Sequence, residues 1–286
     1  MTTGWQIESK RPQCRHDGAV CRSTRSTIAR GSRFFGGAVT GLLITDQGHP
    51  SIRPTEDVDL FVYAAVHADY QRIEASLRKR GFVNDLGKDA PICRWRIGDV
   101  IVDVMPTLEE VLGFSNRWYP LALETAQPTA LPSGITIRLI TAPVFIGTKF
   151  EAFANRGKFD YLFSHDLGDL ISVIDGREEL LMECEQTDSN LQKFLGEKIS
   201  TLLSTAAFLD ALPGHLPGDF ASQERLPRLI EKMREFAMLY LNQGSLVHAS
   251  QQPAQQENSR PKPIRNQPRH LNLVYGACQA SASPDC

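Results

Sequence analysis

The sequence predicts an α+β fold, in which a small mixed β-sheet with flanking helices is followed by a mostly helical C-terminal region. Two observations lead to this prediction. Between residues 33 and 140, short apolar and β-branched runs are separated by turns and helical patterns. Between residues 142 and 245, apolar residues recur at the spacing of amphipathic helices. The change of pattern places a boundary near residue 140.

The first region contains the expected strands, which are recognised by apolar side chains that dominate a short run or alternate with polar ones. A helix is expected at 66–80, because the helical pattern there stops at Gly81, a residue that commonly follows a helix. The expected strands are 34–35, which leads into a Gly-Gly turn, then 58–63, 92–97, 99–105 and 135–140.

The second region is expected to form the helices 144–155, 166–174, 191–209 and 226–241. These patterns divide the chain into a poorly ordered lead-in (1–30), a sheet domain (31–140), a helical domain (141–248) and a disordered tail (249–286). The two ends are assigned in this way because they are polar and show neither the period of a strand nor that of a helix.

Composition excludes several classes of protein. The formal net charge is −2, so the overall charge does not indicate a protein that binds nucleic acid or a membrane surface. No apolar run reaches the roughly 18 residues of a membrane span, and the N-terminus lacks the apolar core of a secretory signal. We therefore expect no membrane partner and a cytoplasmic location. The six cysteines form no CxxC pair, which argues against structural zinc.

Three aspartates carry the most informative pattern. Asp57 and Asp59 lie two residues apart in a predicted strand, so their side chains point to the same face. Asp103 stands alone in a second apolar strand, where an unpaired charge would be costly. If the two strands are neighbours, the three carboxylates offer the hard oxygen ligands that Mg²⁺ prefers. Each aspartate alone has a plainer explanation, such as a solvated strand edge or a strand end.

Residues upstream of the aspartates suit phosphate binding. Gly36-Gly37 follows the predicted strand 34–35, and glycine lets backbone N–H groups approach a phosphate closely at a helix N-terminus. Arg53 is a candidate for a bidentate contact to a triphosphate, with a surface arginine as the alternative. Thr55 is a candidate for orienting the strand that carries the Asp pair.

Gly36-Gly37, Asp57-Val58-Asp59 and Asp103, in this order, resemble the nucleotidyltransferase superfamily of the DNA polymerase β type. The resemblance implies a small mixed sheet flanked by helices, with two Mg²⁺ ions and a nucleoside triphosphate (NTP) bound at the carboxylates. It extends over about residues 33–180.

The second half is similar to the AbiEii/AbiGii-like nucleotidyltransferases, the toxin arm of some type IV toxin–antitoxin systems. The similarity lies in the segment 142–153 with Lys149, the downstream Arg156, and the pair Asp166 and Asp169. It implies that Lys149 contacts the NTP phosphates, that Asp166 is a further active-site carboxylate, and that Asp169 supports it. From the residues alone, Lys149 could also extend to solvent, and Asp166 could simply favour the start of a helix.

The function that the resemblance implies is Mg²⁺-dependent transfer of a nucleoside monophosphate from an NTP to an acceptor hydroxyl. The expected acceptor is RNA, such as a tRNA 3′ end, and a cognate antitoxin is an expected partner. Two alternatives stay open: a small-molecule nucleotidyltransferase of the antibiotic-modifying type, and a degenerate, non-catalytic fold that binds a nucleotide or a partner. The sequence leaves the identity of the nucleotide and the oligomeric state open.

Overall fold

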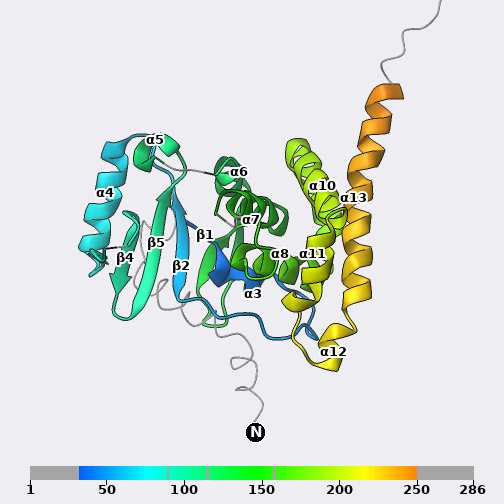
Figure 1. Cartoon of the computed structure of the whole chain (residues 1–286). Helices are drawn as coiled ribbons and strands as arrows, with labels where there is room; N and C mark the ends of the chain where they lie inside the picture. The colour runs from blue at the N-terminus through cyan, green and yellow to red at the C-terminus, as the bar shows by residue number, and fades with distance from the viewer. Residues whose placement is uncertain (1–31, 89, 114–115, 157–158, 250–286) are drawn as a thin grey trace, which may run out of the picture.

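The computed structural model describes residues 32–88, 90–113, 116–156 and 159–249. The predicted lead-in at 1–30 lies outside these residues, as does the predicted tail except for its first residue, Ala249. Within the described ranges the architecture is α+β, as the sequence predicts, with a mixed seven-stranded sheet and a helical C-terminal region. In Figure 1 the sheet lies between helix α4 on one side and the helices of the C-terminal region on the other.

The sheet has the strand order β3-β4-β5-β2-β1-β7-β6. Its centre is β2, which pairs antiparallel with β1 and parallel with β5. The strands are β1 (Ser32–Phe35), β2 (Asp57–Val62), β3 (Val83–Asn84), β4 (Arg94–Ile97), β5 (Val100–Pro106), β6 (Gln127–Ala130) and β7 (Thr136–Leu139). The five strands expected from the sequence are confirmed, while β3 and β6 had no clear pattern.

Alternation along β2 gives the sheet two different faces. Val58 and Leu60 are buried on the face that α4 (His67–Arg78) covers, where the Tyr70 hydroxyl donates a hydrogen bond of 2.7 Å to the Val104 carbonyl. Asp57 and Asp59 lie on the opposite face, because side chains of a strand alternate between faces. One face of β2 is therefore apolar, whereas the other carries Asp57 and Asp59 and then the buried Phe61, which stacks on Phe35.

Helices cover the second face of the sheet and continue away from it. The short η2 (Gly37–Val39) and α3 (Thr40–Leu43) follow β1, and α6 (Tyr119–Thr125) precedes β6. The short α5 (Glu109–Leu112), which follows β5, lies instead beside α4. The C-terminal region contains α7 (Ala142–Arg156), α8 (His165–Gly176), α9 (Leu180–Glu185), α10 (Ser189–Leu203), α11 (Ala206–Ala211), η3 (Leu212–His215), α12 (Phe220–Gln223) and α13 (Leu226–Ala249). The single helix expected at 191–209 is wrong, because the chain breaks between α10 and α11 at Ser204 and Thr205.

The sheet and the helical region share one hydrophobic core, which runs from Phe34 in β1 to Phe236 in α13. The last strand ends at Leu139 and α7 begins at Ala142, close to the predicted boundary. The division into two domains stays a prediction. No helix among the described residues is both long enough and apolar enough to cross a bilayer.

The segment between α3 and β2 is fastened to the end of α8. The backbone N–H groups of Thr45 and Asp46 both donate to the Gly176 carbonyl, at 3.0 and 2.8 Å. Arg225, just before α13, joins the carboxylates of Asp46 and Asp175, each at 2.6 Å. The segment that precedes the Asp57 strand is thus held by helices far along the chain.

Candidate active site

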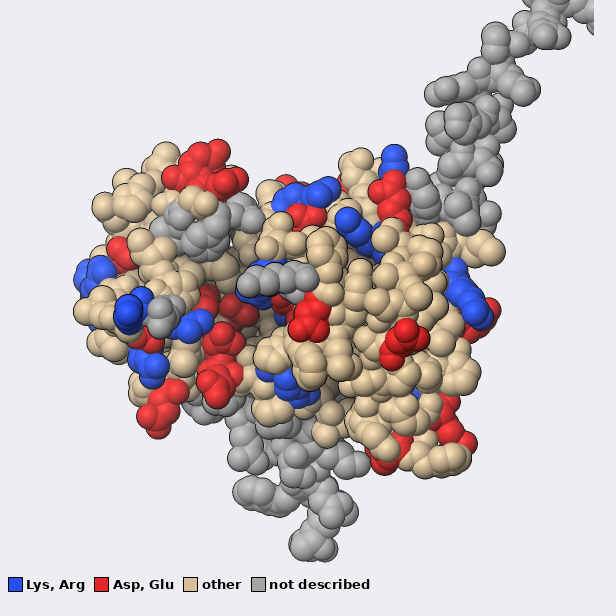
Figure 2. All heavy atoms as spheres, in the orientation of Figure 1, with Lys and Arg blue, Asp and Glu red and all other residues tan. Residues whose placement is uncertain are grey.

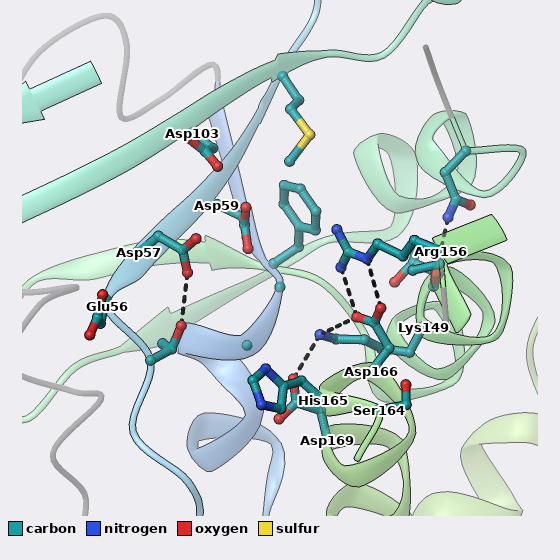
Figure 3. Close-up of a pocket in the computed structure, with 18 of the residues that line it drawn as sticks. Glu56, Asp57, Asp59, Asp103, Lys149, Arg156, Ser164, His165, Asp166 and Asp169 are labelled. Carbon is teal, nitrogen blue, oxygen red and sulfur yellow. Dashed lines mark hydrogen bonds and ion pairs between the residues drawn. The ribbon is translucent and has the colours of Figure 1, made fainter. Parts of the chain in front are cut away.

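A cleft of about 1120 Å³ separates the charged face of the sheet from α7 and α8. The site residues that the sequence singled out all line this cleft: Gly36, Gly37, Arg53, Thr55, Asp57, Asp59, Asp103, Lys149, Asp166 and Asp169. Figure 2 shows acidic side chains gathered where the surface is hollowed between the two parts of the molecule. Figure 3 shows the strand carboxylates facing a second group of charges from the helices.

The first wall of the cleft is a row of charges across three strands. Asp59 on β2 is in register with Asp103 on β5, and Asp103 is in register with Arg94 on β4. Residues that are paired in this way point to the same face of a sheet. Asp57 joins them from two residues before Asp59. The two aspartate strands are therefore neighbours, which is the condition for a shared site of the three carboxylates.

Arg94 holds two of these carboxylates. Its Nε donates to Asp103 Oδ1 at 2.8 Å, and its Nη2 donates to Asp103 Oδ2 at 2.7 Å. The same Nη2 lies 3.4 Å from Asp57 Oδ2. Asp57 also accepts a hydrogen bond of 2.8 Å from the Thr55 hydroxyl, so Thr55 orients the carboxylate at the start of this strand.

Asp59 carries the least compensated charge of the row. Loss of water deep in the cleft, followed by repulsion from Asp57 and Asp103, raises its pKa from the ordinary value of 3.8 to about 8. Lys149 and Arg156 oppose this shift, but more weakly. A carboxylate in this position favours a proton or a metal cation beside it.

Gly36 makes room for Asp59. Its backbone has φ 73° and ψ −166°, a conformation that is essentially restricted to glycine. A Cβ atom on Gly36 would lie 1.7 Å from Asp59 Oδ2. A Cβ atom on Gly37 would lie 3.3 Å from Asp169 Oδ2, so this turn brings the two walls of the cleft together. Glycine is therefore required at position 36 for the carboxylate to occupy its place.

The second wall is a buried ion-pair network between α7 and α8. Lys149 Nζ donates to Asp166 Oδ1 at 3.1 Å and to Asp169 Oδ2 at 2.7 Å. Burial alone would lower the pKa of Lys149, but Asp169 and Asp166 outweigh it and hold the pKa above its ordinary value. Arg156 adds a bidentate pair to Asp166, with both hydrogen bonds at 2.8 Å.

The cations of this second wall differ in how far they reach the cleft. The Lys149 side chain is only 8% exposed, whereas the Arg156 side chain is 73% exposed while it holds Asp166. Arg53 joins this wall from the segment between α3 and β2: its side chain is 42% exposed and lies 3.9 Å from Asp169 Oδ1. Arg156 and Arg53 are thus the cations of this wall that an anion in the cleft can reach.

Sequence reasoning did not assign Arg94 to the site, although a signal was present. The strands 92–97 and 99–105 surround Gly98-Asp99, so a hairpin turn there would have placed Arg94 opposite Asp103. Arg156 was noted only as part of a resemblance. Its bidentate contact depends on how α7 meets α8, which the sequence does not specify.

The strand carboxylates suit a divalent metal in their chemistry and their register. Three carboxylates that can supply hard oxygen ligands lie on one face of two adjacent strands, and loss of water, followed by repulsion from Asp57 and Asp103, raises the pKa of Asp59. As the side chains stand, no group of three or more His, Cys, Asp or Glu within the described ranges is arranged to hold a metal. Both oxygens of Asp103 accept from Arg94 instead. The residues therefore fit Mg²⁺, provided that Arg94 releases them.

Comparisons with known proteins add no assignment to this geometry. The chain matches no protein-family model, and no curated protein matches it. What the cleft does has to follow from its own chemistry: one wall of carboxylates, and one wall on which arginines face the open space.

Proposed function

We propose that this protein is a Mg²⁺-dependent nucleotidyltransferase, which transfers a nucleoside monophosphate from an NTP to an acceptor hydroxyl. The observation that supports it best is the in-register placement of Asp59 and Asp103 on neighbouring strands, with Asp57 on the same face. The opposite wall supplies Arg156 and Arg53, which suit the oxygens of a triphosphate. Paired metal-binding carboxylates and phosphate-binding cations are the two requirements of this chemistry.

The strand wall holds the metal. Asp57, Asp59 and Asp103 would bind Mg²⁺, two ions being expected, and Thr55 keeps the Asp57 carboxylate oriented through its hydroxyl. When bound, the ions stabilise the charge that develops on the α-phosphate and lower the pKa of the attacking hydroxyl. Asp59 contributes most to attracting the Mg²⁺ ions, because its negative charge is the least compensated of the three carboxylates.

The helical wall positions the triphosphate. Arg156 and Arg53 face the cleft and bind its oxygens, while Asp166 fixes the guanidinium of Arg156 through two parallel hydrogen bonds. Lys149 in turn holds Asp166 and Asp169 in place. Asp166 therefore acts by positioning Arg156, and the contact of Lys149 with phosphates stays a prediction.

For the acceptor we propose the end of an RNA, such as a tRNA. The protein would then be a toxin-like component that has a cognate antitoxin as its partner. The cleft has a volume of about 1120 Å³. Pockets for a single small molecule are typically about 300–1,000 Å³, so there is room for an acceptor end beside the NTP. A small hydroxylated acceptor is the competing case that the assay below separates.

The proposed activity predicts label transfer that depends on Asp57. Purified protein with Mg²⁺, total tRNA and one α-³²P-labelled NTP at a time is expected to label RNA with at least one nucleotide. Asp57→Asn is expected to lower the rate about a thousandfold, because it removes a metal ligand. Asp99→Asn is the matched control, since Asp99 is an exposed aspartate in the β4–β5 turn.

Each outcome of this assay has a definite meaning. Label on small hydroxylated compounds but not on RNA would show that the acceptor is a small molecule, and the proposed nucleotidyl transfer would stand. No label on RNA, protein or small molecules, or equal rates for the Asp57→Asn variant and the unaltered protein, would contradict the proposed function.

Substitution of Gly36 is expected to damage the site by displacing Asp59. Gly36→Ala forces a restricted backbone conformation, at about 1–3 kcal/mol, and places a methyl group against the carboxylate. We expect transfer to fall about a hundredfold or more, the scale of a misplacement of about 1 Å. Rates and thermal unfolding would be measured together.

Gly81→Ala is the control for backbone strain alone. Gly81 has φ +87°, and no atom that a new methyl group could meet lies within 4 Å of the position it would take. This variant is expected to lose stability while its transfer rate is retained. If Gly36→Ala and Gly81→Ala behave alike in both measurements, the specific role of Gly36 is refuted.

A further inference from the structure

In the free protein, a guanidinium occupies the carboxylates to which the proposed function assigns the metal. Arg94 makes a bidentate pair with Asp103 through hydrogen bonds of 2.8 and 2.7 Å, and it reaches Asp57 Oδ2 at 3.4 Å. The Arg94 side chain is 24% exposed, so the pair lies largely inside the protein. Two oxygens of Asp103 and one of Asp57 are thus taken by the same cation.

This contact is built into the sheet. Arg94 and Asp103 are directly opposed in the β4–β5 pair, and Asp103 is opposed to Asp59 on its other side. Bidentate arginine–carboxylate pairs are among the strongest hydrogen-bonded ion pairs. A divalent cation needs the same carboxylate oxygens as ligands. Arg94 and a metal on Asp103 therefore compete, because both are cations that draw on the same two carboxylate oxygens.

We propose that Arg94 is a positioning residue that competes with the divalent metal for Asp103 and Asp57, so that metal binding displaces it. This inference rests on the proposed function, because it requires a metal at these carboxylates. Without metal, Arg94 pairs with the buried carboxylate of Asp103, which would destabilise the protein if it had no partner. With metal, the guanidinium is released into the cleft that holds the triphosphate.

The test is a Mn²⁺ titration of the full chain without nucleotide, with free Mn²⁺ followed by electron paramagnetic resonance. Arg94→Gln is expected to bind Mn²⁺ about tenfold or more tightly than the unaltered protein, which is the scale of one charge-assisted hydrogen bond. A purely structural role predicts the opposite sign, since loss of the pair would loosen Asp103.

Arg96→Gln is the matched control. Arg96 lies two residues along the same strand and pairs with Asp85, with Nε 2.9 Å from Oδ2. Its substitution removes the same charge from the same face, but from a more exposed ion pair that solvent and salt screen. Its Mn²⁺ affinity is expected to stay within about twofold of the unaltered protein.

If Arg94→Gln does not fold, a more conservative variant tests the inference. Arg94→Lys keeps the charge but loses the planar fork, so its Mn²⁺ affinity is expected to lie between those of the glutamine variant and the unaltered protein. Unchanged or weaker Mn²⁺ binding in the folded Arg94 variants would overturn the inference.

Failure of the inference can be told from failure of the proposed function. If the unaltered protein binds Mn²⁺ and Asp57→Asn does not, the metal site stands whatever the Arg94 variants show. If neither the unaltered protein nor any Arg94 variant binds Mn²⁺, both the inference and the metal-dependent function are refuted.

Discussion

Asp59→Asn is expected to stabilise the metal-free protein while it lowers nucleotidyl transfer by about a thousandfold or more. The amide keeps the shape of the side chain, but it removes a carboxyl group whose charged form is disfavoured by loss of water and then by repulsion from Asp57 and Asp103. It also removes an expected metal ligand. One substitution should therefore move stability and activity in opposite directions, which is characteristic of a site built for function.

The pH dependence of this effect follows from the shifted pKa. The pKa of Asp59 is raised from 3.8 to about 8 in the folded protein, so between these values the folded state keeps a proton that the unfolded state has lost. The contribution of Asp59 to the stability of the unaltered protein therefore falls as pH rises through this range, by at most about 1.4 kcal/mol per pH unit. The asparagine variant lacks this dependence, so its advantage should grow from pH 5 to about pH 8.

Thermal unfolding in the presence of a chelator, at several pH values, measures this advantage. Asp99→Asn serves as the control, because it makes the same chemical change at an exposed position in the β4–β5 turn. Added Mg²⁺ should stabilise the unaltered protein more than the asparagine variant, and so reduce the difference in thermal stability between the two proteins. An asparagine variant that is less stable than the unaltered protein at every pH would contradict the charge balance described for this wall.

Lys149→Met is expected to produce the largest loss of stability. Lys149 is buried and donates to Asp166 and Asp169, so its removal leaves buried carboxylates without their shared cation. Breaking a buried pair in this way costs about 3–5 kcal/mol. The melting temperature should fall by roughly 10 °C for a chain of this size. Most of the loss should come from Asp169, because Arg156 still holds Asp166.

A double variant separates the lost pairing from a general loss of packing. Lys149→Met with Asp169→Asn is expected to recover much of the stability, and the double-mutant cycle gives the coupling between the two residues. Lys193→Met is the control: Lys193 is exposed and lies 4.0 Å from Glu197, so its loss should stay within about 0.5 kcal/mol. Unchanged stability of Lys149→Met would show that the network is not needed for the fold.

The strand wall of the site could be predicted because its information is local. Asp57 and Asp59 share a face by the period of a strand, and Asp103 stands out as a charge in an apolar run. Gly36 could be flagged as a turn, but its approach to Asp59 depends on the β1–β2 register. The β4–β5 register likewise decides that Arg94 meets Asp103; the short turn at Gly98-Asp99 indicates this register, although sequence reasoning did not draw the contact from it.

The parts that could not be predicted depend on long-range packing. Strand β6 is polar and contains Pro128, which is tolerated because β6 lies at the edge of the sheet. The helix expected at 191–209 is two helices, because periodicity alone does not mark the break at Ser204 and Thr205. Lys149 could be placed on the border of an apolar helix face, but its two carboxylate partners come from another helix.

The fastening of residues 45–46 to Gly176 and of Asp46 to Arg225 has a consequence for synthesis of the chain. Asp57 leaves the ribosome more than a hundred residues before Asp166, and Arg225 follows later still. Closing such distant contacts is slow and comes late in folding. A nascent chain that has made its sheet still lacks the helical wall, so the cleft can close only after Gly176 and Arg225 have emerged.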